Sequence, residues 1–173
     1  DELAEKLRLM RNFGFTNYDK TAHIGTNAKM SEFAAAYGLV HFDELDSIIE
    51  QNKKIHQAYL QEFSEFKELK FLDYTFTGKS NYQYVVAHVS SDIRDSLVDY
   101  FHAHGILLRR YFHPGCHHME PYASHKQYRD LHLTNTDKIS SEILVFPTGS
   151  QLSPSTIKEF SDHYRKFKEA HKL

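Results

Sequence analysis

The chain has 173 residues, enough for one domain with a sizeable core, and its 21 basic and 23 acidic residues leave a net charge of −2. This balance excludes the basic footprint of a nucleic-acid binder and a polybasic membrane anchor. No apolar stretch approaches the ~20 residues of a membrane-spanning helix. The single cysteine excludes an internal disulfide and fits a reducing cytoplasm. Because Asp1 is not a start methionine, we expect a trimmed chain or one cut from something longer.

The first third of the sequence is typical of helices. Leu3, Leu7 and Met10 recur at helical spacing and predict an amphipathic helix over Glu2–Arg11, followed by a glycine stop and a loop or ragged strand. Ser31 is a predicted N-cap of an alanine-rich helix. A longer amphipathic helix is predicted over 43–66.

The rest of the sequence alternates strands and helices. Its predicted elements, in chain order, are a strand at 81–89, a helix from Ser91 or Asp92 to His102, a strand at 106–112, a loop at 114–138, a strand at 142–146 and a helix at 154–170 capped by Ser153. We therefore expect a small α+β domain that follows a helical arm, residues 31–66.

One segment, 109–122, concentrates chemically capable side chains. Three imidazoles and the thiol of Cys116 fall within residues 113–118, which raises a metal site as a hypothesis. The spacing matches no standard zinc pattern and no second ligand cluster is visible, so we expect no metal there. Arg109 and Arg110 suggest instead a pocket for an anionic or sugar ligand, since guanidinium groups bind phosphate well. The alternative is a strand with one face in the core, and Cys116 as an ordinary cysteine.

A second segment, 25–32, is a loop that enters a helix. The backbone N–H groups at a helix start suit an anion, and Asn27 and Lys29 lie where they could assist. The alternative is an ordinary helix cap, because this is not a glycine-rich phosphate motif.

Several motifs in order resemble one enzyme family. They are Arg-Asn-Phe-Gly-Phe at 11–15, Gly-x-Asn-x-Lys-Met-Ser-Glu at 25–32, Arg-Tyr-Phe-x-Pro at 110–114 and Ile-Leu-x-Phe-Pro at 143–147. The chain is similar, from Leu3 to about Phe160, to the DegT/DnrJ/EryC1/StrS aminotransferases. The resemblance implies the C-terminal part of an α/β, fold type I enzyme that depends on pyridoxal phosphate (PLP). Residues 1–66 would then be the end of the large domain with linking helices. Residues 67–173 would be a small α+β domain with a short sheet and flanking helices.

The resemblance also implies a function. Such enzymes are dimers that transfer an amino group, usually from glutamate, to a nucleotide-linked keto-deoxy sugar, as in polysaccharide biosynthesis. The family's catalytic lysine lies upstream of the matching region, so we expect this chain alone to be inactive and not to hold PLP covalently. The alternative is a non-catalytic remnant that binds a nucleotide sugar or mediates dimerisation.

Site residues follow from the resemblance by position. Asn27 would bond the PLP phosphate of a neighbouring subunit, and Lys29 stands where the family usually has arginine, which keeps the charge but loses the bidentate fork. Tyr111, His113 and His118 would line the nucleotide-sugar pocket, and Arg110 would face its phosphates. The helical arm would expose an apolar stripe that the large domain normally covers, so we expect self-association through it.

Overall fold

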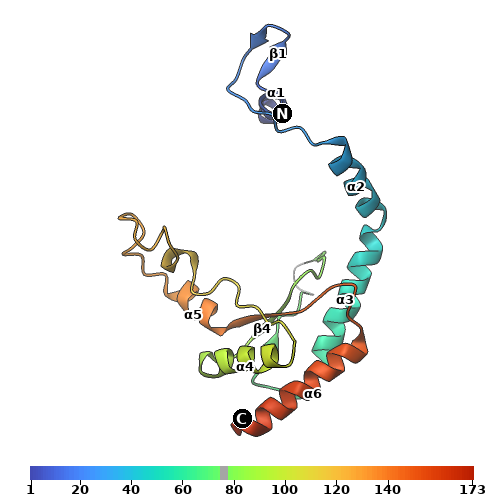
Figure 1. Cartoon of the computed structure of the whole chain (residues 1–173), viewed down its shortest axis with the longest axis vertical. Coiled ribbons are helices and arrows are strands. Elements are labelled where there is room, and N and C mark those ends of the chain that lie inside the picture. Colours follow the sequence, from blue (N-terminus) through green and yellow to red (C-terminus); the bar gives the residue numbers. More distant parts are fainter. Residues whose placement is uncertain (75–77) are drawn as a thin grey trace. The chain divides into compact units, whose positions relative to one another are not determined.

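The computed structural model describes residues 1–74 and 78–173, which form two compact units, Asp1–Leu45 and Asp46–Leu173 (Figure 1). This division comes earlier than the boundary at 66/67 that the sequence predicts. The second long helix therefore belongs with the second unit. The assignment of residues 1–66 to the end of a large domain stays a prediction.

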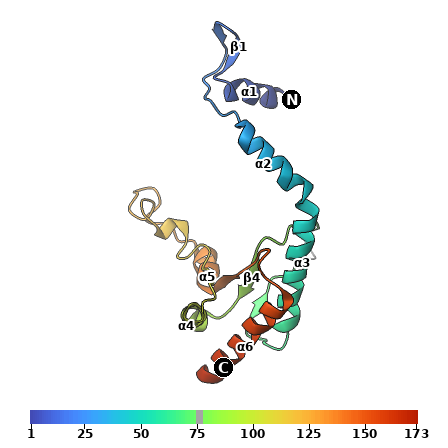
Figure 2. The same cartoon turned by 45° about the vertical axis from the view of Figure 1, so that its right-hand side comes forward.

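The first unit contains two helices and a hairpin, seen at the blue end of the chain in Figure 2. Helix α1 spans Glu2–Arg11, as predicted, and the carboxylate of Asp1 accepts a hydrogen bond from Leu3 N at 3.1 Å. Strands β1 (Phe15–Asn17) and β2 (Lys20–Thr21) pair antiparallel within the stretch predicted as a loop or ragged strand. Helix α2 spans Glu32–Asp43, and the hydroxyl of Ser31 caps it by accepting from Ala34 N at 3.2 Å.

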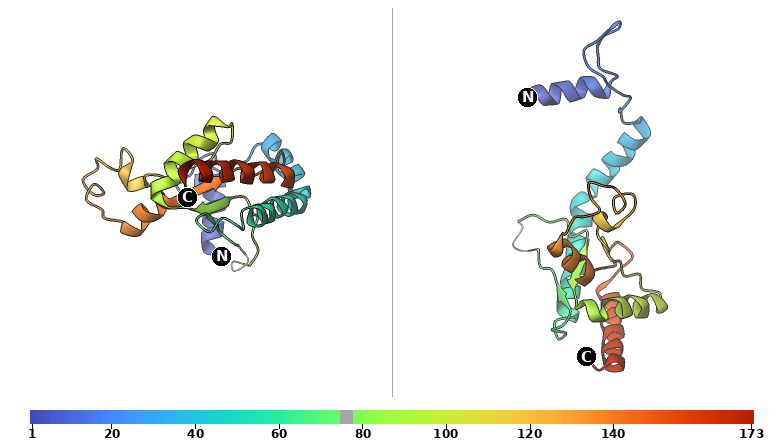
Figure 3. Two further views of the ribbon diagram at one scale, coloured as in Figure 1. Left: turned by 90° about the horizontal axis from the view of Figure 1, so that it is seen from below. Right: turned by 90° about the vertical axis from the view of Figure 1, so that its left-hand side faces the viewer.

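The second unit is built on one antiparallel sheet. Its strand order is β3 (Lys70–Phe71), β4 (Val85–His88) and β5 (Ile143–Phe146). Because strand side chains alternate between faces, one face carries the buried Val85, Ala87, Leu144 and Phe146. The helices that contribute to the core of this unit are α3 (Leu45–Glu62), α4 (Ser91–Ala103) and α6 (Pro154–His171) (Figure 3).

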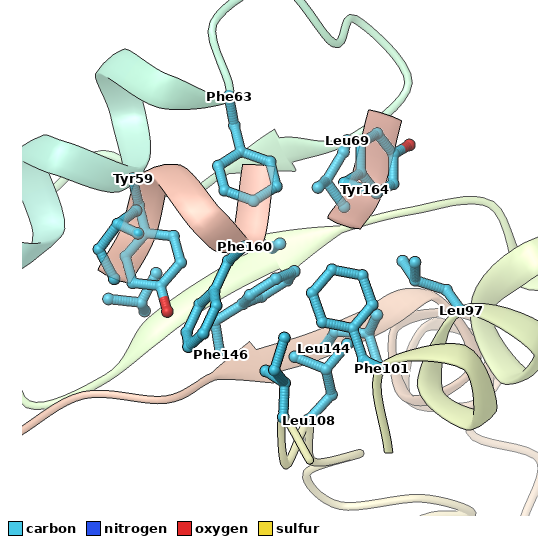
Figure 4. Close-up of a cluster of buried hydrophobic side chains, with 14 of the residues drawn as sticks. Tyr59, Phe63, Leu69, Leu97, Phe101, Leu108, Leu144, Phe146, Phe160 and Tyr164 are labelled. Carbon is cyan, nitrogen blue, oxygen red and sulfur yellow. The ribbon is translucent and has the colours of Figure 1, made fainter. Parts of the chain in front are cut away.

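The core lies where these helices meet the sheet, and aromatic rings dominate it (Figure 4). Phe146 of β5 is the hub, with ring centroids 5.5 Å from Tyr59, 5.8 Å from Phe63, 5.1 Å from Phe71 and 5.9 Å from Phe101. Burial raises the pKa of the Tyr59 phenol well above its usual range, and its hydroxyl donates to the Pro147 carbonyl at 3.0 Å. Phe146 thus joins the sheet to α3 and α4, and α6 reaches the same cluster through Phe160, whose ring centroid lies 6.4 Å from that of Tyr59.

The predicted strand at 106–112 is wrong. Only Arg109 pairs with β5, through two backbone hydrogen bonds to Val145 of 3.0 and 2.8 Å. The chain turns on both sides of this contact, because Leu108 N bonds the Ile106 carbonyl and His113 N bonds the Arg110 carbonyl. The strand that completes the three-stranded sheet beside β4 and β5 is instead the two-residue β3.

The predicted loop at 114–138 is also more structured than expected. It contains the 3-10 turn η2 (Cys116–His118) and the start of helix α5 (Thr134–Glu142). Both carry residues of the candidate site.

Candidate functional site

In the first unit, the loop that carries Asn27 is held against the end of α1. Thr26 N donates to the Met10 carbonyl at 2.9 Å, and Asn27 forms a backbone bridge with Asn12. The crossing is tight: a Cβ on Gly25 would lie 2.4 Å from the nitrogen of Gly14. Glycines at both positions are therefore what lets the two backbone segments meet.

Lys29 is held by this same crossing. Its ammonium donates to the side-chain oxygen of Asn12 at 3.0 Å and lies 5.2 Å from the centroid of the Phe13 ring. Asn27 and Lys29 are both exposed. The loop therefore carries an oriented ammonium and an exposed amide two residues apart, groups that can bind a phosphate. The sequence motifs include Asn12, but only the structure shows that it positions Lys29.

In the second unit, a cleft of about 550 Å³ opens at the end of the sheet. Its polar lining residues are Gln83, Tyr84, Arg109, Tyr111 and Thr148. The guanidinium of Arg109 donates to the Tyr111 hydroxyl at 2.6 Å, and the Tyr84 ring lies edge-on to Tyr111 with centroids 6.2 Å apart. Of the residues predicted to bind substrate, Tyr111 is the one that lines this cleft.

Arg110 and His113 belong to a separate network centred on Asp95. Arg110 donates to Asp95 Oδ1 at 2.9 Å, and Nε of the buried Arg94 lies 2.8 Å from the same oxygen. Partial burial of Asp95 raises its pKa, but the Arg110 hydrogen bond and the two positive charges outweigh this and lower the pKa overall. Arg94 also donates to the Ser140 carbonyl at 2.8 Å, and its Nη2 lies 3.4 Å from Nε2 of His113. This network ties α4 to α5 and to the loop between them.

His118 pairs with Asp137 of α5. The Nε2 atoms of His118 and of its buried neighbour His117 both lie 2.9 Å from Asp137 Oδ1. These three ligand atoms lie within 4.8 Å of one another, so the structure adds a carboxylate to the histidine cluster. Each imidazole already has a hydrogen-bond partner in Asp137. The expectation that no metal binds here stays a prediction. Cys116, which follows Gly115, is an exposed cysteine that forms no disulfide.

The six predicted site residues therefore fall into distinct groups. Asn27 and Lys29 lie together in the first unit. In the second unit, Tyr111 lines the cleft, while the rest contact Asp95, Arg94 or Asp137. Sequence reasoning missed Tyr84. It named Arg109 together with Arg110 as a candidate for an anionic ligand, but it could not tell which of the two lines the cleft.

Within the described part of the chain, no helix is long and apolar enough to cross a membrane.

The chain is similar in sequence to a family of sugar aminotransferases. The profile of the DegT/DnrJ/EryC1/StrS aminotransferase family matches residues 1–164. The chain is 28% identical over 170 residues to the dTDP-4-amino-4,6-dideoxy-D-glucose transaminase of Shigella dysenteriae, covering 96% of this chain and 46% of that protein. It is also 28% identical over 177 residues to the pleiotropic regulatory protein of Geobacillus stearothermophilus, again covering 46% of that protein.

Solved structures agree with this comparison. DesI, determined in the presence of its TDP-sugar product, is 31% identical, superposes with a TM-score of 0.83 and matches 99% of this chain and 46% of its own. DesV of S. venezuelae, solved with a ketimine intermediate, is 23% identical with a TM-score of 0.83, covering 97% of this chain and 44% of its own, and shows the shared fold. The fold is that of the type I PLP aminotransferases, as the motifs predict. The chain spans under half the length of these relatives. It belongs to the DegT/DnrJ/EryC1/StrS aminotransferase family and corresponds to roughly its C-terminal half.

Proposed function

We propose that this chain is the C-terminal part of an aminotransferase that moves an amino group from an amino acid, glutamate in the first instance, to a nucleotide-linked keto-deoxy sugar. The observation that carries the proposal is the family match over residues 1–164. It is supported by the likeness to DesI, whose structure was determined with a TDP-sugar product. A cytoplasmic location, fitting a lone free cysteine, is part of the proposal.

The first unit would contribute to PLP binding. The ammonium of Lys29 and the amide of Asn27 fit a phosphate, because both are exposed and the Asn12 hydrogen bond fixes the direction of Lys29. When bound, PLP supplies the electron sink for amino transfer. The role of Asn27 and Lys29 is to hold the phosphate end of the cofactor in place.

The second unit would contribute to substrate binding. Tyr111 presents an aromatic ring and a hydroxyl to the cleft. His118, oriented by Asp137, and His113, beside Arg94, offer imidazoles that sugar hydroxyls can bond. Arg110 does not line the cleft, and its contact with Asp95 would instead hold the loop that carries these residues.

The chain contains no residue that matches the family's catalytic lysine, so we propose that it does not catalyse amino transfer alone. The test is to incubate the chain with PLP, reduce with borohydride and map modified peptides by mass spectrometry. We expect only scattered, substoichiometric labelling of surface lysines. A stoichiometric adduct on one lysine would contradict the proposal.

We further propose that α2 is covered in the functional assembly, with homodimerisation through the helical arm. Every side chain of α2 is at least partly exposed, and Phe33, Leu39 and Phe42 are 84, 67 and 74% exposed. Because large apolar surfaces of this kind mark interaction sites, the isolated chain should self-associate.

A further inference from the structure

The cleft at the end of the sheet carries a single charge. Its polar lining residues are Gln83, Tyr84, Arg109, Tyr111 and Thr148, and the rest of the lining is apolar, with Phe146, Pro147 and Phe160 among it. Among the described residues that line it, Arg109 is the only charged one. A volume of about 550 Å³ lies in the usual range of small-molecule sites, roughly 300–1,000 Å³. A cleft with one cation and no carboxylate favours an anionic ligand.

Arg109 is fixed in place but not neutralised. Its backbone is bound to Val145 by hydrogen bonds in both directions, of 3.0 and 2.8 Å. Its guanidinium donates to the Tyr111 hydroxyl at 2.6 Å, with the guanidinium carbon 5.7 Å from the Tyr111 ring centroid. In the described part of the chain, Arg109 forms no ion pair with a carboxylate. Most of its five N–H donors are therefore open to a ligand.

The neighbouring arginines differ from Arg109 in this respect. Arg110 and the buried Arg94 both contact Oδ1 of Asp95, so their charges are already partnered. Of these two consecutive arginines, Arg109 is therefore available to an anion, whereas Arg110 holds the loop through Asp95.

The aromatic side chains indicate that the anion is attached to a ring. Tyr84 is 48% exposed and meets Tyr111 edge-on, with ring centroids 6.2 Å apart. Exposed tyrosine rings beside a guanidinium offer packing surfaces for a sugar or a base. The hydroxyl of Thr148 donates to the Gln83 carbonyl at 2.9 Å, which joins the two segments at the mouth of the cleft.

We propose that this cleft binds the diphosphate and an adjoining ring of the nucleotide-linked sugar, with Arg109 as the phosphate-binding residue. The inference rests on the proposed function and refines it, because it moves the phosphate contact from Arg110 to Arg109. Tyr111 is the positioning residue, since its hydroxyl holds the guanidinium in the cleft.

The test is calorimetric titration of the 173-residue chain with dTDP, with inorganic pyrophosphate and with thymidine. Arg109→Ala should weaken dTDP binding by about tenfold or more, because a charge-assisted, bidentate contact is lost. Arg109→Lys should restore part of the affinity, since the charge returns without the fork. The matched control, Arg110→Ala, should change affinity by less than about threefold because Arg110 already contacts Asp95. Tyr111→Phe keeps the ring and should weaken binding less than Arg109→Ala.

Pyrophosphate should compete with dTDP, and thymidine should bind more weakly than dTDP, if phosphate is the group recognised. Far-UV circular dichroism and thermal melting confirm that each variant is folded. Unchanged dTDP affinity in Arg109→Ala, or an equal loss in Arg110→Ala, overturns the inference and leaves the nucleotide-sugar function standing. Absence of saturable dTDP binding by the wild-type chain also overturns it, and amino transfer by the complete reading frame then decides the proposed function separately.

Discussion

Replacing Phe146 with alanine tests whether one aromatic hub joins the sheet to its helices. The side chain is 2% exposed and contacts four other rings. An aromatic side chain buries roughly 150–250 Å², which at about 25 cal/mol per Å² gives an upper value of about 4–6 kcal/mol. Core Phe→Ala changes cost about 3–5 kcal/mol in practice, so we expect about 4 kcal/mol for Phe146→Ala.

The assay is equilibrium unfolding in urea followed by far-UV circular dichroism, because the chain contains no tryptophan. With a slope of roughly 1–3 kcal/mol per M, the unfolding midpoint should fall by about 2 M. The matched control is Phe112→Ala, because Phe112 is 68% exposed in the same unit and its loss should cost under about 1 kcal/mol. A midpoint for Phe146→Ala no lower than that of the control would refute the reasoning.

Three further changes test other parts of the structure. Gly14→Ala places a Cβ 1.8 Å from the His23 carbonyl oxygen at φ +78°, so the contact between the 25–27 loop and the end of α1 should open. Hydrogen–deuterium exchange of the backbone amides in this contact should become at least about tenfold faster, and exchange at the wild-type rate would refute this prediction. Burial lowers the pKa of His163 below its ordinary 6.5, so the unfolded chain binds more protons and stability should fall as the pH drops below 6.5. His163→Gln should flatten this dependence in urea titrations at pH 7.5 and 5.5, and an unaltered slope would contradict it. The wild-type chain should self-associate at micromolar concentration in sedimentation velocity, and Phe33→Glu with Phe42→Glu should weaken this association; a monomeric wild type would argue against it.

The helices could be predicted from sequence because their signals are local. The spacing of apolar residues gives the bounds of α1, and Ser153 with Pro154 marks the start of α6, where the serine hydroxyl accepts from Thr156 N. The strands are harder, since pairing depends on distant partners. The segment 106–112 has the composition of a strand, yet only Arg109 finds a partner in β5.

In the candidate site, too, local motifs could be read from the sequence, whereas contacts between distant residues could not. The sequence motifs identify the loops that carry Asn27 and Arg110, but not what each side chain contacts. The motif gives the phosphate contact to Arg110, but Arg110 pairs with Asp95, 15 residues away on α4, and the sequence does not show this pairing. Asp137, 20 residues from His117, is invisible as a partner until the loop folds back.

The most direct test of the central claim is amino transfer by the complete reading frame that contains this segment. The protein is purified with PLP and supplied with glutamate and a dTDP-linked 4-keto-6-deoxy sugar, and 2-oxoglutarate and amino sugar are measured together. We predict equal amounts of both products, and a rate at least about tenfold lower in Asn27→Ala because a phosphate contact is lost. Lys6→Ala, on the exposed surface of α1, should leave the rate unchanged. A folded, PLP-loaded protein that transfers no amino group to a nucleotide-linked keto sugar would contradict the claim.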